Sequence, residues 1–201
     1  MIVMQYAEHG NLLSYLDQNI SMTWRMKLQH LEEIGHCLDG IHMNELVHGN
    51  LHDRNIMFKR KHHDNVKAFI CDFCHSQSRV SNQKSNIQVV TPFIAPEVFD
   101  TWKHTQKLKS DIYAFGIIMY LVANGKIPFR NRLLDSNFAR DIKNGLRPAM
   151  PASAPVAYKE LAEHCCDADP NKRPEVWEIL SRISKLIKEI DDDDIWDSIL
   201  Q

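Results

Sequence analysis

Residues 46–57 read LVHGNLHDRNIM, and this stretch decides how the rest of the chain is interpreted. An amphipathic run precedes it at Thr23–Glu45, and an apolar, β-branched run follows it at Val66–Phe73. Gly49 and Asn50 break the periodicity, and five further polar side chains crowd the same stretch: His48, His52, Asp53, Arg54 and Asn55. The pattern predicts an irregular loop between two rigid elements, which is where catalytic groups are commonly found.

The flanking runs predict a mainly α fold with one short β-hairpin. After Ser21 or Thr23 as an N-cap, apolar or semi-apolar side chains recur at steps of three and four, which is typical of a one-sided amphipathic helix. These positions are Trp24, Leu28, Leu31, Ile34, Leu38, Ile41 and His42. Two short apolar runs around the turn-forming cluster His63-Asp64-Asn65 predict the hairpin, at Ile56–Lys59 and Val66–Ile70.

The most apolar segment is Asp111–Ala123, which we expect to form a helix buried on all sides. Gly125 suits its C-terminal cap, and Pro128 prevents its continuation. Weaker patterns predict a strand at Ile2–Met4 and four further helices: Asn11–Asp17 with Asn11 as N-cap, Phe138–Lys143, Val156–Cys165 and Pro174–Ile190.

Composition and charge indicate one globular domain at residues 1–190, followed by an acidic tail at 191–201. Of the 201 residues 44% are apolar and 25% are charged, and the net charge of −2 gives no electrostatic reason to expect nucleic acid or a membrane surface as partner. No apolar run reaches the length of a membrane span, and the first residues lack the pattern of a signal peptide. The five cysteines follow no disulfide framework, so we expect reduced thiols and a cytoplasmic protein.

The spacing H-x-N-L-x-x-x-N at residues 48–55 resembles the catalytic loop of protein kinases, H-R-D-L-x-x-x-N. Five more segments resemble kinase motifs in the family's order: a hinge at Met4–Ala7 with Gly10-Asn11-Leu12, D-F-G at Asp72-Phe73-Cys74, A-P-E at Ala95-Pro96-Glu97, the central helix at Ser110–Gly116 and a late loop at Asp169–Pro174. The set is similar to the hinge and C-terminal lobe of the tyrosine-kinase-like group. Because the chain begins at the hinge and has no G-x-G-x-x-G, we expect the N-terminal lobe to be missing.

This resemblance implies ATP and Mg²⁺ as cofactors. Four residues would line the adenine site: Met4, Gln5, Ala7 and Met57. Asn55 and Asp72 would hold the metal, and through it the phosphates. The catalytic candidates of the loop are Asn50, His48 and His52, with His48 also retained for packing. The resemblance gives the other motif residues structural roles: Phe73 in packing, Asp111 in holding the loop backbone, and Glu97 in an ion pair with Arg173. We also expect the free N–H groups at the start of the central helix to favour Asp111.

The catalytic loop departs from the kinase pattern at the residue that orients the attacking hydroxyl. Asn50 stands where kinases have an aspartate, and an amide has no anionic oxygen to accept a proton. General bases contribute about 10²–10⁴-fold to rate, so a loss of that order is expected. His52 also replaces a phosphate-contacting lysine of the kinase pattern. Gly49 stands where kinases have an arginine, and Cys74 stands where they have the D-F-G glycine.

These departures predict a pseudokinase or severely impaired kinase, acting as a regulatory or scaffold module on a protein partner that is another kinase or a substrate. The alternative is a piece of an active Ser/Thr or Tyr kinase in which His52 or Asp53 compensates for Asn50. Two other interpretations explain less of the chain: haem attachment at Cys71–His75, and a zinc site built from Cys71, Cys74, Cys165, Cys166, His164 or His62-His63. A serine cluster at 76–85 is a candidate phosphoacceptor site.

Overall fold

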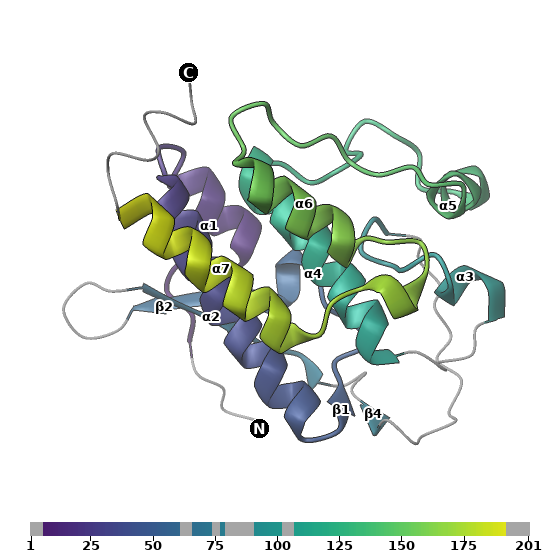
Figure 1. The fold of residues 1–201 in the computed structure, drawn as a ribbon, viewed down its shortest axis with the longest axis horizontal. Helices are drawn as coiled ribbons and strands as arrows, with labels where there is room; N and C mark the ends of the chain where they lie inside the picture. The colour runs from purple at the N-terminus through teal and green to yellow at the C-terminus, as the bar shows by residue number, and fades with distance from the viewer. Residues whose placement is uncertain (1–5, 61–65, 74–76, 79–90, 102–106, 192–201) are drawn as a thin grey trace.

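The structure, a computed structural model, describes residues 6–60, 66–73, 77–78, 91–101 and 107–191. It is mainly helical, with two small antiparallel sheets (Figure 1). The helices are α1 (Leu12–Gln18), α2 (Trp24–Met43), η1 (Asp53–Asn55), α3 (Val98–Thr101), α4 (Lys107–Asn124), α5 (Ser136–Lys143), α6 (Val156–Cys165), η4 (Pro170–Lys172) and α7 (Val176–Asp191). The strands are β1 (Leu46–Val47), β2 (Ile56–Arg60), β3 (Val66–Ile70) and β4 (Gln77–Ser78).

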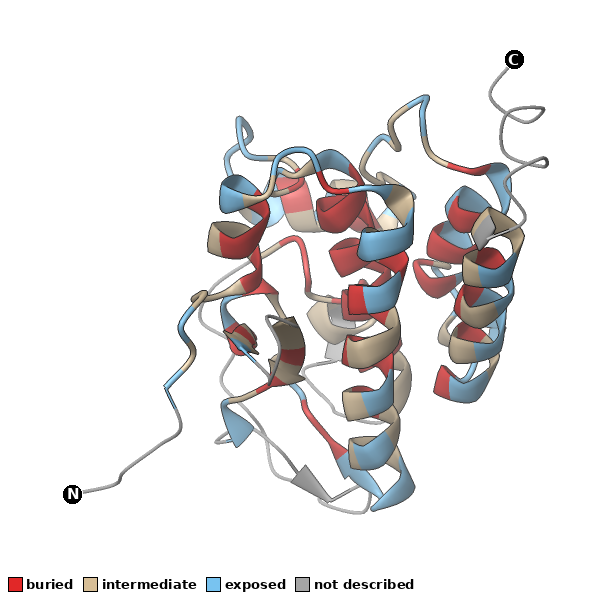
Figure 2. Ribbon diagram, turned by 90° about the vertical axis from the view of Figure 1, so that its left-hand side faces the viewer, coloured by how far each residue is buried: buried red, intermediate tan, exposed pale blue. Residues whose placement is uncertain are grey.

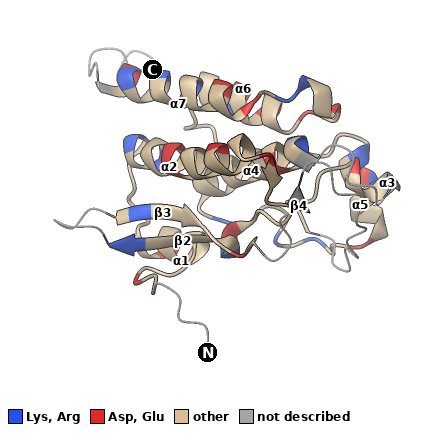
Figure 3. Ribbon diagram, turned by 90° about the horizontal axis from the view of Figure 1, so that it is seen from below, with Lys and Arg blue, Asp and Glu red and all other residues tan. Residues whose placement is uncertain are grey.

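The described elements lie in layers on either side of α2 and α4 (Figure 3). On one side α6 and α7 cover these two central helices, and on the other lie the β2–β3 hairpin and α1. Every residue of α4 from Asp111 to Ala123 is buried, as its nearly uniform apolar character predicts. Across the molecule, buried residues gather where the helices face one another and exposed ones on their outer sides (Figure 2). The core therefore centres on α4, and the polar loop at 48–55 leads from this core to the hairpin.

Local sequence signals set several of these boundaries. The side chains of Asn11 and Thr23 accept hydrogen bonds from the backbone N–H groups of Ser14 and Met26, so both predicted N-caps are confirmed. The predicted hairpin is also confirmed, with Ile56 opposite Ile70 and Arg60 opposite Val66. The strand expected at Ile2–Met4 lies outside the described residues, as does the acidic tail beyond residue 191.

The central helix begins earlier than the sequence analysis expected. It starts at Lys107, four residues before Asp111, and so includes the polar residues Lys109 and Ser110. The same correction applies to α5, which begins at Ser136 because Asp135 caps it by accepting hydrogen bonds from the N–H groups of Asn137 and Phe138. At the other end of α4 the prediction holds: Gly125 follows the helix with a φ of 64°.

Gly116 allows α4 and α6 to pack closely. A Cβ atom added at this residue would lie 2.5 Å from Cys166 Sγ and 2.8 Å from Cys165 Cβ. Both cysteines are buried, and the Cys166 thiol lies 3.7 Å from the carbonyl oxygen of Tyr113. The two cysteines are therefore packing residues at a helix crossing in this part of the molecule.

Candidate active site

Asp111 fixes the start of the polar loop from inside α4. Its carboxylate accepts hydrogen bonds from two successive loop amides, His48 N–H at 2.8 Å and Gly49 N–H at 2.9 Å. His42 of α2 places its Nε2 atom 3.0 Å from the same carboxylate. Asp111 is only 2% exposed, so these contacts satisfy a buried charge.

This arrangement corrects one expectation about Asp111. The residue lies within the helix and not at its free N–H groups, so the loop amides, together with His42, stabilise the carboxylate. The contact with the loop backbone is the one that the kinase resemblance implies. The role of His42 escaped the sequence analysis, which placed this residue only on the semi-apolar face of a helix.

His48 connects the loop to the chain that follows β3. Its Nε2 atom lies 3.0 Å from the Cys71 carbonyl oxygen, and its Nδ1 atom lies 3.3 Å from the backbone nitrogen of Asn50. A carbonyl only accepts and a backbone N–H only donates, so these two contacts require the neutral tautomer that carries its proton on Nε2. The buried ring also packs edge-on against Phe73, with ring centroids 5.5 Å apart.

Asn55 is positioned by contacts on both sides. Its side-chain Nδ2 donates to the backbone carbonyl oxygen of Asn50 at 2.8 Å. The backbone carbonyl oxygen of Asn55 accepts from Cys71 N–H at 2.9 Å. This backbone bond extends the β2–β3 pairing by one residue pair, Asn55 with Cys71. Asp72 directly follows Cys71. Asp72 is exposed and has a φ of 64°, a left-handed conformation that aspartate adopts more readily than most residues.

The donor set of Asn55 and Asp72 fits a magnesium ion. The Asn55 amide nitrogen is used within the loop, which leaves Oδ1 as the ligand atom, and Asp72 supplies a carboxylate. Mg²⁺ prefers such oxygen ligands and usually keeps only one or two protein groups beside substrate phosphates. These two residues would hold the metal, and the metal would neutralise charge on the phosphates of a nucleotide.

Asn50 occupies the position of the expected general base. It is half-buried, its backbone contacts hold the loop, and its side-chain amide makes no hydrogen bond with any other described residue. The side chain is therefore available to a substrate, but an amide can orient a hydroxyl without taking up its proton.

His52 and Asp53 are engaged in the local structure of η1. His52 caps η1 with Nδ1, 3.2 Å from the Arg54 backbone nitrogen, and its Nε2 atom lies 3.1 Å from Asn55 Nδ2. Burial lowers the pKa of His52, although the Asp53 carboxylate, 3.9 Å from Nδ1, opposes this effect. Asp53 is itself only 6% exposed. Neither side chain is a freely accessible base.

On the adenine side, the structure describes two of the four predicted residues, Ala7 and Met57. Asn11 forms a β-bridge with Met57, and Phe58 N–H donates to the Gly10 carbonyl oxygen at 2.9 Å. The turn from Ala7 to Gly10 is thereby held against β2, and Ala7 and Met57 are both half-buried. Met4 and Gln5, the other two predicted adenine contacts, lie outside the described residues.

Glu97 and Arg173 form the expected ion pair. Arg173 donates to both carboxylate oxygens, at 2.8 Å from Nη1 and 2.7 Å from Nη2, and its side chain is fully buried. Ser110 also donates to Glu97, at 3.0 Å. Lys109 donates to the carbonyl oxygens of Arg173 and Pro174 at 2.8 and 3.2 Å, a support that the sequence analysis missed.

Other site hypotheses find less support among the described residues. No group of three or more His, Cys, Asp and Glu side chains within them could hold a metal ion, and Cys165 and Cys166 lie in the α4–α6 packing. Cys74, His75, His62 and His63 lie outside the described residues, as do Ser76, Ser81 and Ser85. None of the described helices has the length and apolar character needed to cross a membrane.

A helical lobe, a clamped polar loop, an Asn–Asp pair beside it and a partly buried Glu–Arg pair together define a protein kinase domain. The family model for protein tyrosine and serine/threonine kinases matches residues 1–183, and the chain belongs to this family.

Individual relatives agree with this assignment. The chain is 28% identical to the probable serine/threonine-protein kinase roco5 of Dictyostelium discoideum over 90% of its own length, and 31% identical to roco8 of the same organism over 92%. It is 27% identical to the dual specificity protein kinase pyk3, also of Dictyostelium discoideum, over 94%. The chain spans only 7%, 10% and 14% of the lengths of these three proteins, respectively.

Proposed function

We propose that this domain is a pseudokinase or severely impaired kinase that still binds Mg-ATP and acts as a regulatory or scaffold module. The observation that carries the proposal is Asn50. It stands at the general-base position in a loop whose other supports, from Asp111 and His48 to Asn55, are all in place. The loop retains its architecture and lacks the proton acceptor.

The neighbouring side chains support this proposal because they do not replace the missing base. His52 Nδ1 accepts from Arg54 N–H, so the acceptor nitrogen of this ring is used within η1, and Asp53 is buried beside it. Loss of a general base of this kind lowers rate by about 10²–10⁴-fold.

Nucleotide binding can persist when phosphoryl transfer is lost, because binding depends on residues other than Asn50. The metal would be held by Asn55 and Asp72, and the adenine would contact Ala7 and Met57, together with Met4 and Gln5 by resemblance. A protein partner, either another kinase or a substrate protein, follows from the regulatory role.

The alternative is an active Ser/Thr or Tyr kinase. It is favoured by the intact Asp111 clamp and Glu97–Arg173 pair, and by the kinase names of the relatives. A partial test is genomic: the coding sequence upstream of Met1 is searched for a Gly-rich loop, a strand lysine and a helix glutamate. Their absence from the natural protein removes the enzyme alternative, since phosphates need these groups.

The deciding experiment compares the full-length natural protein with its Asn50→Asp variant in a Mg-ATP phosphorylation assay. We expect the aspartate variant to transfer phosphate at least about a hundredfold faster, because it regains a proton acceptor. Equal and measurable turnover of the two proteins would defeat the pseudokinase proposal.

Nucleotide binding is measured separately by thermal shift. A ligand that binds only the folded state raises its apparent stability, so Mg-ATP should raise the melting temperature of the natural protein. Asp72→Asn should abolish the part of this shift that depends on magnesium, and Asp39→Asn, a change of the same kind on α2, should not.

A further inference from the structure

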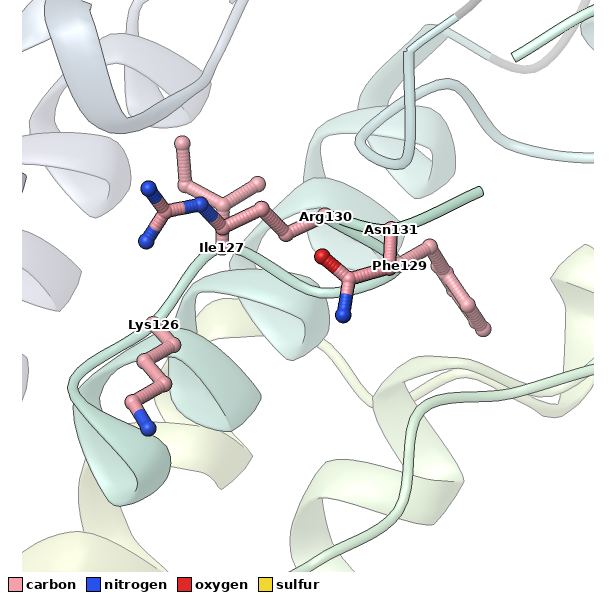
Figure 4. Close-up of a pocket in the computed structure, with 5 residues that line it drawn as sticks. All are labelled: Lys126, Ile127, Phe129, Arg130 and Asn131. Carbon is pink, nitrogen blue, oxygen red and sulfur yellow. The ribbon is translucent and has the colours of Figure 1, made fainter. Parts of the chain in front are cut away.

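A groove lies at the end of α4, and none of its lining residues is assigned to nucleotide or metal. Five residues line a cavity of about 530 Å³: Lys126, Ile127, Phe129, Arg130 and Asn131 (Figure 4). A second cavity, of about 220 Å³, shares three of these and adds others: Asn124, Pro128, Pro148 and Ala149. Because they share lining residues, we treat the two as one groove and call it the α4–α5 groove, residues 124–131 with Pro148 and Ala149.

The α4–α5 groove carries two cations that have no partner among the described residues. Lys126 and Arg130 are both exposed, and neither makes a hydrogen bond or an ion pair with any part of the chain that the structure describes. In the view of Figure 4 both side chains extend away from the Phe129 ring. The groove thus combines free positive charge with the apolar surface of Ile127 and the prolines.

Nearby carboxylates do not neutralise these cations. Asp135 accepts hydrogen bonds from two backbone N–H groups as the N-cap of α5, and Asp141 pairs with Arg132. Neither acid therefore pairs with Lys126 or Arg130, and these two exposed side chains add positive charge at the groove. A ligand of opposite charge would be attracted to it.

The loop that forms the groove is held in a fixed shape. Phe129 has a φ of 59°, which is costly for a bulky side chain, and its ring packs edge-on against Phe138 of α5 at 5.2 Å. Arg132 N–H donates to the Phe129 carbonyl oxygen at 2.9 Å. A preformed loop loses little conformational freedom when it binds a partner, which favours recognition.

We propose that the α4–α5 groove is a docking site for an acidic segment of a partner protein. Carboxylates of the segment contact Lys126 and Arg130, and one apolar side chain lies against Ile127 and the prolines. This docking does not depend on whether the domain transfers phosphate, so its test is independent of the Asn50 experiment.

The test measures binding of a fluorescent polyglutamate peptide with one central phenylalanine to the full chain by anisotropy. We expect Lys126→Glu with Arg130→Glu to weaken binding at least about tenfold, because attraction becomes repulsion. Added salt should weaken binding to the natural chain, because solvent-exposed charges are screened. A glutamine version of the peptide should not bind, and a glycine in place of its phenylalanine should weaken binding.

The matched control is Lys172→Glu with Lys188→Glu, on η4 and α7, which changes the net charge equally. These two lysines are also exposed, and binding should stay unchanged. A thermal melt verifies that both double variants fold, and Lys126→Gln with Arg130→Gln replaces the charge reversal if that variant does not.

Three results would overturn the proposal. The first is that the natural chain fails to bind the peptide. The second is that the control double variant weakens binding as much as the groove double variant does. The third is that the glutamine peptide binds the natural chain as tightly as the glutamate peptide does. A chain ending at Asp191 that binds the peptide markedly more tightly would show that the groove receives the chain's own acidic tail, and this too would contradict a partner-protein segment.

Discussion

Arg173 holds both oxygens of the Glu97 carboxylate, 76 positions away in the sequence, with hydrogen bonds of 2.8 and 2.7 Å. It also donates to the carbonyl oxygens of Lys109 and Asp167, at 2.8 and 2.9 Å, and its guanidinium lies 5.2 Å from the centre of the Tyr113 ring. One side chain thereby ties the segment after Ala95 and Pro96 to α4 and to the loop before α7.

Arg173→Met should destabilise the domain strongly, because it leaves a carboxylate and two carbonyl groups without their donor. Removing one partner of a buried pair costs about 3–5 kcal/mol, and Glu97 is partly exposed, so we expect the lower end of this range in urea unfolding. Glu97→Gln should cost less, since Arg173 keeps its carbonyl partners. Equal losses from the two variants would contradict this account.

Asp111→Asn tests the clamp on the polar loop. A carboxylate accepts from both His48 and Gly49 N–H groups, whereas an amide has only one acceptor oxygen. One loop amide is then left unpaired, which costs about 1–3 kcal/mol when buried. Hydrogen exchange should accelerate at His48 or Gly49, and the matched change Asp39→Asn on α2 should leave both amides protected.

Gly116→Ala and Gly40→Ala form a matched pair of helix substitutions with opposite expected signs. At Gly116 the new Cβ meets Cys166 Sγ at 2.5 Å, and overpacking of this kind costs about 1–3 kcal/mol. At Gly40, exposed on α2, nothing lies within 4 Å, and alanine should stabilise the helix by about 0.5–1 kcal/mol. Chemical denaturation measures both, and stabilisation by Gly116→Ala would contradict the close α4–α6 packing.

The sequence predicted those features that local patterns encode. The N-caps Asn11 and Thr23 were identified because capping residues stand directly before apolar periodicity. The loop at 48–55 was identified because its polar residues keep a fixed spacing.

The features that escaped prediction depend on distant parts of the chain. Periodicity placed His42 on the inner face of its helix but could not show that its partner is Asp111, 69 positions later. No local pattern around Lys109 indicates that its ammonium group donates to the carbonyl oxygens of Arg173 and Pro174, more than 60 positions later. The cations of the α4–α5 groove could not be singled out from the sequence, because only the structure shows that Asp135 caps α5 and that Asp141 pairs with Arg132.

His52 should make the stability of the domain depend on pH. Burial lowers the pKa of its imidazole in the folded state below the ordinary value near 6.5. Between these two pKa values the unfolded chain binds more protons than the folded one, so stability is lost as the pH falls below about 6.5 and is fully present above it.

His52→Asn removes this titration while keeping a side chain that can cap η1 through the Arg54 N–H group. The free energy of unfolding is measured for both proteins from pH 8 to pH 5, and the difference between the two curves isolates His52 from the other histidines. We expect the natural protein to lose more stability than the variant as the pH falls. If the two curves stay parallel, the folded state tolerates protonated His52, and the ring is less well desolvated than its position beside Asn55 and Phe93 implies.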